Sequence, residues 1–94
     1  MEIKLSFNIT FVSGEQTTQD ITVKADPNHP VETQMKALMQ QMFGQYVSVG
    51  MLRQPEKDHY VLLCPSQIAM VECKLPSIIL ADATEIPVPR VTLD

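Results

Sequence analysis

The sequence predicts one α+β domain in which a single helix packs on a small antiparallel or mixed sheet, in the order ββα followed by two or three strands. Three observations predict this class. Residues 3–11 alternate between apolar and polar side chains, residues 31–42 carry apolar side chains at helical spacing, and short apolar runs separated by prolines follow residue 46. A length of 94 residues suits one domain and is too short for two.

The first strand is expected over residues 3–11, because its side chains change character with a period of two. One face of such a strand packs on a core while the other meets water. A turn at Gly14 and a second strand around residues 18–24 complete a hairpin, with Ile21 and Val23 facing inward. The apolar positions of the first strand are Ile3, Leu5, Phe7, Ile9 and Phe11.

A helix is expected over residues 30–43. Pro30 fits the first turn of a helix, where its missing N–H costs no hydrogen bond, and Asn28 or His29 is predicted as the N-cap. Gly44 is predicted to end the helix as the residue after its C-cap. The predicted buried stripe consists of Val31, Met35, Leu38, Met39 and Met42.

The second half of the chain is expected to add strands to the sheet. Residues 46–52 are predicted as a strand and residues 53–58 as a loop. Residues 59–64 and 68–74 are predicted to pair with each other as a hairpin, and residues 78–80 to form a last short strand. Because both sides of the strand over residues 59–64 are apolar, one helix cannot cover both, and a second cover is needed.

The domain is expected to span residues 1–80, with residues 81–94 as an extended tail that contains prolines. Pro87 and Pro89 exclude a central strand there. An extended apolar segment gains stability along a sheet edge or an apolar groove. We therefore predict that the tail docks on the face carrying Tyr60 and Leu62, within one chain or exchanged between two copies.

The order of hairpin and helix resembles the front half of the ubiquitin-like β-grasp fold, over residues 2–44. The resemblance rests on the pattern of elements. It implies a helix that crosses one face of the sheet, and it assigns no functional residue.

Charge and composition argue against nucleic-acid binding, membrane insertion and secretion. The chain has 7 Lys and Arg against 11 Asp and Glu, a formal net charge of −4, with no basic stripe to neutralise phosphates, so we expect no nucleic-acid partner. No apolar stretch approaches the roughly 20 residues of a membrane span, and the N-terminus does not resemble a signal peptide. With two cysteines and no secretory signal, the predicted location is cytoplasmic, away from membranes.

Catalytic and metal chemistry receive little support from the sequence. Cys64 and Cys73 lack the closely spaced partners of a zinc site, and both are predicted to be buried, inert thiols. In the predicted hairpin His59 lies opposite Cys73, so a small enzyme that uses His59 and Cys73 remains an alternative. The main expectation is no catalytic residue, no cofactor and no metal.

The function expected from the sequence is therefore a non-enzymatic protein–protein interaction module, self-associating as a homodimer. It would act through an apolar surface of the strands in the second half of the chain. A second alternative is a small regulatory protein that acts on nucleic acid or on another regulator. The residues predicted to form the interaction surface are Tyr60, Leu62, Ile79 and Val88.

Overall fold

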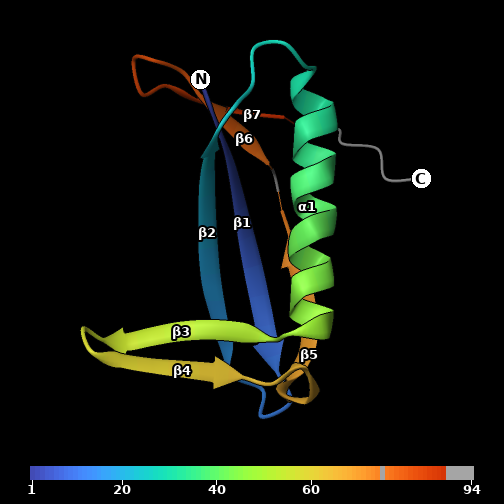
Figure 1. Ribbon diagram of the computed structural model, residues 1–94, viewed down its shortest axis with the longest axis vertical. Helices are drawn as coiled ribbons and strands as arrows, with labels where there is room; N and C mark the ends of the chain where they lie inside the picture. The colour runs from blue at the N-terminus through green and yellow to red at the C-terminus, as the bar shows by residue number, and fades with distance from the viewer. Residues whose placement is uncertain (75, 89–94) are drawn as a thin grey trace.

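Strand β1 (Glu2–Phe11) is the centre of the fold, and other strands flank both of its edges (Figure 1). The structure is a computed structural model, and it describes residues 1–74 and 76–88. One helix packs on a five-stranded antiparallel sheet, and two further strands form a separate hairpin. The predicted α+β class and the order ββα followed by strands are confirmed.

On one edge, β1 pairs along almost its whole length with β2 (Gln16–Lys24) as the predicted hairpin. Two short strands share its other edge. Strand β5 (Ile68–Cys73) pairs with the second half of β1, and β6 (Ser77–Ile79) pairs with its beginning. Strand β7 (Glu85–Pro87) then pairs with β6 from outside. The prediction that residues 68–74 pair with residues 59–64 is therefore wrong.

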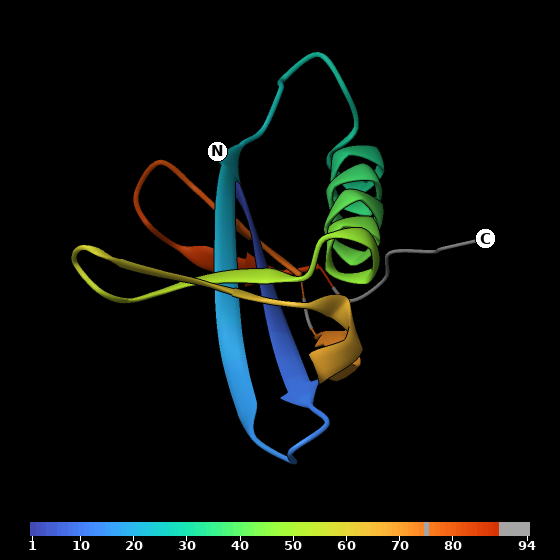
Figure 2. The ribbon, with the colours of Figure 1, turned by 60° about the horizontal axis from the view of Figure 1, so that its bottom comes forward.

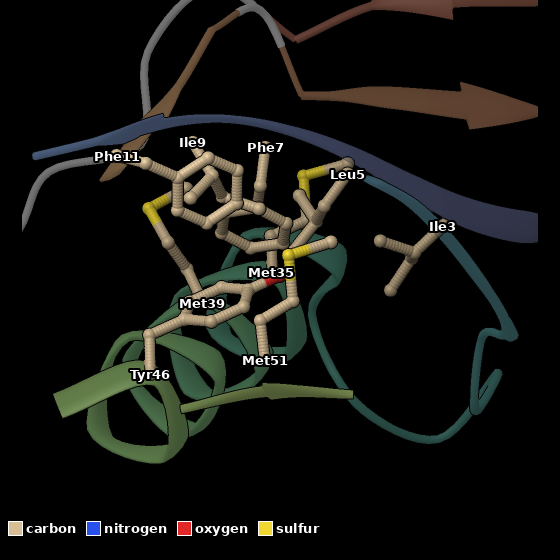
Figure 3. Close-up of a cluster of buried hydrophobic side chains, with 9 residues drawn as sticks. All are labelled: Ile3, Leu5, Phe7, Ile9, Phe11, Met35, Met39, Tyr46 and Met51. Carbon is tan, nitrogen blue, oxygen red and sulfur yellow. The ribbon is translucent and has the colours of Figure 1, made fainter. Parts of the chain in front are cut away.

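The core lies between β1 and helix α1 (Val31–Ser48). The alternating apolar residues of β1 are all buried, as the period of two predicts. Figure 3 shows the side chains of Leu5, Phe7, Ile9 and Phe11 gathered with those of the helix and of Met51. Met35 and Met39 are buried on the predicted helical stripe, and Val31, Leu38 and Met42 pack partly buried beside them. The buried cluster consists of Ile3, Leu5, Phe7, Ile9, Phe11, Met35, Met39, Tyr46 and Met51.

The helix begins differently from the prediction, because Pro30 is its N-cap and no side chain caps it. Neither Asn28 nor His29 has that role. Instead, the Gln34 side chain reaches back from the first turns: its amide donates to the carbonyl oxygens of Asp26 and His29, and its oxygen accepts from the Asp26 N–H. These bonds fix the loop that leads into the helix, and none of them involves an N–H group of the first helical turn.

The helix continues through Gly44 to Ser48, so the predicted end at Gly44 and the predicted strand over residues 46–52 are wrong. Phe43 and Tyr46 both contact the Phe7 ring edge-on, with centroids 5.6 and 5.7 Å away. These aromatic contacts outweigh the roughly 1 kcal/mol that glycine costs inside a helix. Gly50, at φ +101°, ends the helix, and its N–H donates to the Gln45 carbonyl oxygen at 3.1 Å.

After the helix, β3 (Met51–Glu56) and β4 (His59–Leu63) form a hairpin, followed by a short 3-10 turn η1 (Pro65–Gln67). The predicted loop over residues 53–58 is therefore mostly strand. We call β3 and β4 with their connecting turn the arm. Figure 2 shows the arm extending from the end of α1 past the edge of β2.

The sheet face opposite α1 is polar. Ser6 donates to the Asp20 carboxylate at 2.7 Å, and Lys4 lies 3.6 Å from the Glu85 carboxylate. This arrangement confirms the expected wet side of β1. Within residues 1–74 and 76–88, no helix has the length and apolar character needed to cross a membrane.

Candidate interaction site

One face of the arm exposes three large apolar side chains. Leu52 and Leu62 lie directly opposite each other in the hairpin, and Tyr60 is two residues from Leu62, so the strand period places all three on the same side. Their side chains are 61%, 53% and 66% exposed. We call this surface the arm face: Leu52, Tyr60 and Leu62.

The opposite face of the arm joins it to the core only at its base. Met51 and Leu63 are paired, and Met51 is buried while Leu63 packs against the cluster. Val61, further out on the same side, is half-buried. The base is held tightly, because a Cβ at Gly50 would lie 2.0 Å from the Leu63 carbonyl oxygen. Only glycine permits this approach of the two strands.

The four residues predicted to form the interaction surface fall in two places. Tyr60 and Leu62 belong to the arm face. Ile79 lies on β6, and Val88 follows β7 and packs against the core, so both belong to the five-stranded sheet. Both are half-buried. The structure thus brings one pair of the four residues together and places the other pair on a different sheet.

A groove of about 330 Å³ lies between the end of α1 and the strand β5. Phe43, Tyr46 and Val47 form its helix side. Pro65 of η1 and the first residues of β5, Ile68–Val71, form the other side. Its walls are mostly apolar side chains, and the Tyr46 hydroxyl donates to the Gln19 side chain of β2.

Sequence reasoning missed Leu52 and this groove. The sequence predicts residues 46–52 as one strand, which puts Val47 and Leu52 in the same element. In the structure the helix takes the first part of that run and the arm takes the last part. Exposed Val47 and Val49, at 77% and 53%, mark the boundary. The residue in the sequence that marks this boundary between helix and arm is Gly50, and not Gly44.

Burial, with a smaller contribution from the charge of a Cys73 thiolate, raises the pKa of Tyr46 to about 12. Burial also raises the pKa of the Cys73 thiol, partly offset by a hydrogen bond from the Ser6 backbone. Both groups are therefore neutral at physiological pH. They lie on the core side of the sheet, close to Phe7.

The two thiols differ in exposure. Cys73 is half-buried, whereas Cys64 is exposed at the end of the arm, so the prediction of two buried thiols is wrong for Cys64. The error follows from the pairing, because Cys64 leads into η1 and has no partner strand over it.

We expect iodoacetamide to modify Cys64 at least about tenfold faster than Cys73 at pH 7.5, because the thiolate is the reacting form and burial disfavours it at Cys73. Mass spectrometry of the native chain and of Cys64→Ser measures the two rates. Equal rates, or a Cys73 that reacts first, would show that β5 opens readily from the sheet.

The structure separates His59 from Cys73. His59 pairs with Glu56 at the outer end of the arm, and Cys73 pairs with Phe7 in the main sheet. The predicted juxtaposition of these two residues is therefore wrong. Among the residues the structure describes, no three His, Cys, Asp or Glu side chains gather in a way that could hold a metal ion.

Comparison of the chain with models of protein families, with curated proteins and with solved structures gives no match. The arm face and the groove are therefore interpreted from their own geometry.

Proposed function

We propose that this chain is a non-enzymatic protein interaction module that self-associates as a homodimer through the arm face. The observation that carries the proposal is the exposure of Leu52, Tyr60 and Leu62 on one side of a hairpin that extends beyond the sheet.

The low stability expected of an isolated hairpin favours a second protein surface that covers the arm face. A two-stranded hairpin by itself is at best marginally stable in water. Here only the base, at Met51 and Leu63, is packed on the core. Full burial of a large apolar side chain contributes about 1.5–3 kcal/mol, so covering the arm face stabilises both the arm and the complex.

A second copy is a suitable cover for two reasons. A two-fold arrangement places the same surface on both partners, and an apolar face is complementary to itself. The outer part of the arm carries Arg53 and Lys57 beside Glu56 and Asp58, so its charges balance and two arms do not repel each other.

Light scattering after gel filtration tests the proposal. The native chain is expected to have twice the mass of one chain, and Leu62→Asp the mass of one, because a buried unpaired carboxylate opposes association. Val12→Asp is the control, since Val12 is 61% exposed in the β1–β2 turn. A native chain that remains monomeric at about 200 µM would overturn the proposal, since a homodimer of standard interface size associates far below that concentration.

A further inference from the structure

The outer edge of β5 is open in the part of the chain that the structure describes. β5 and β6 follow each other along the same edge of β1, but β7 covers only β6. In an antiparallel strand every second residue directs its N–H and C=O away from its partner. β5 therefore presents unpaired backbone groups at a position where another strand can add.

The apolar groove lies beside this edge. Val71 and Ile68 of β5 form one wall, and Phe43 and Val47 of α1 form the other. An open strand edge provides backbone hydrogen bonds, and an adjacent groove receives alternate side chains of an added strand. The site therefore suits an extended segment with apolar residues at every second position.

The chain itself approaches this site from β7. The Val88 N–H donates to the Pro76 carbonyl oxygen at 2.7 Å, and the Val88 side chain packs against the core. Upstream, the Glu85 carboxylate accepts a hydrogen bond from the buried Ser77 hydroxyl at 2.8 Å and lies near Lys4. β7 is thus fixed on β6, and its direction leads from β6 toward the free edge of β5.

We propose that residues 89–94, which lie outside the described residues, dock on the free edge of β5 of their own chain. Their sequence is Pro-Arg-Val-Thr-Leu-Asp, with apolar residues at alternate positions. At roughly 3.3 Å per residue, six residues extend about 20 Å, which is enough to pass the junction of β6 and β5 and to run along most of β5. This inference is independent of self-association through the arm face.

The register of β6 and β7 predicts which side chains enter the groove. Ser77 pairs with Pro87, and one-for-one continuation brings Leu93 beside Val71 and Val91 beside Cys73. Val71 and Cys73 lie opposite Ile9 and Phe7, on the core side of the sheet. Leu93 therefore enters the groove beside Val71.

In that register Pro89 would fall opposite the junction of β5 and β6, where the pairing with β1 shifts. Phe7 pairs with Cys73 but Lys4 pairs with Ser77, so one extra residue separates the two strands. A proline lacks the N–H that regular pairing requires, and it is tolerated at such an interruption.

Amide hydrogen exchange of β5 tests the proposal, measured by NMR in the Leu62→Asp background so that association through the arm face does not contribute. In a chain ending at Val88, and in Leu93→Asp, the outward-directed amides of β5 are expected to exchange at least about tenfold faster than in the Leu62→Asp parent. Thr92→Asp is the matched control, because in the proposed register residue 92 would point away from the groove, and this variant should retain the protection.

Equal exchange of the β5 amides in the parent, truncated and Leu93→Asp chains would overturn the proposal. Protection of β5 that disappears on dilution would also overturn it, because the docked segment would then come from a second copy. Self-association through the arm face is tested separately, by the mass of the native chain in solution.

Discussion

Phe7→Ala is expected to lower the free energy of unfolding by about 3–5 kcal/mol. Phe7 is completely buried at the centre of β1. Its ring contacts both Phe43 and Tyr46, so it anchors the last turns of the helix past Gly44 (Figure 3). Urea unfolding followed by circular dichroism measures the loss.

Val12→Ala is the control for Phe7→Ala, and it is expected to change stability by less than about 0.5 kcal/mol because Val12 is exposed. A second consequence of Phe7→Ala is earlier fraying of the helix after Gly44, visible as faster amide exchange there. A loss below about 1 kcal/mol would contradict the assignment of Phe7 to the core, because core deletions of this size cost several times more.

Gly50→Ala is expected to destabilise the chain severely and to loosen the arm. A non-glycine residue in a strained backbone region costs about 1–3 kcal/mol, and Gly50 has φ +101°. The clash adds to this cost, because the new Cβ would lie 2.0 Å from the Leu63 carbonyl oxygen, a backbone atom. Urea unfolding gives the total, and NMR shifts of β3 and β4 show whether the arm detaches.

Gly44→Ala is the matched control for Gly50→Ala. Gly44 lies inside the helix with nothing within 4 Å of a Cβ, so alanine is expected to raise stability by about 0.5–1 kcal/mol. If Gly50→Ala is as stable as the native chain, the turn between α1 and β3 cannot hold residue 50 at a positive φ against the Leu63 carbonyl oxygen.

The elements with strong local periodicity could be predicted from the sequence. The alternation of β1 and the stripe containing Met35 and Met39 determine which faces are buried, and both predictions are confirmed. The end of the helix could not be predicted in this way. Gly44 and Gly50 are both possible helix ends locally, and the choice depends on contacts of Phe43 and Tyr46 with Phe7, far away in sequence.

Strand pairing in the second half could not be predicted either. β4 and β5 are adjacent in sequence and separated by a short bend, which favours a local hairpin. In the structure β4 pairs back with β3, and β5 crosses to β1. The apolar pattern indicates that a strand is buried, but it does not name the partner strand.

The candidate site was predictable only in part for the same reason. Tyr60 and Leu62 are two residues apart on one strand, so their common face follows from the sequence alone. Leu52 joins them through cross-strand pairing, and the groove joins α1 to β5. Both features depend on non-local pairing and so emerge only in the fold.

Disulfide trapping on the arm face tests the central claim most directly. In a Cys64→Ser, Cys73→Ala background, Leu62→Cys is expected to form a covalent dimer under mild oxidation, because a two-fold interface brings this position near its own copy. Val12→Cys, at a position that is similarly exposed but lies outside the arm face, is expected to remain monomeric. The contradicting result is that none of the variants Leu62→Cys, Leu52→Cys and Tyr60→Cys yields more covalent dimer than Val12→Cys. Self-association through the arm face would then be wrong.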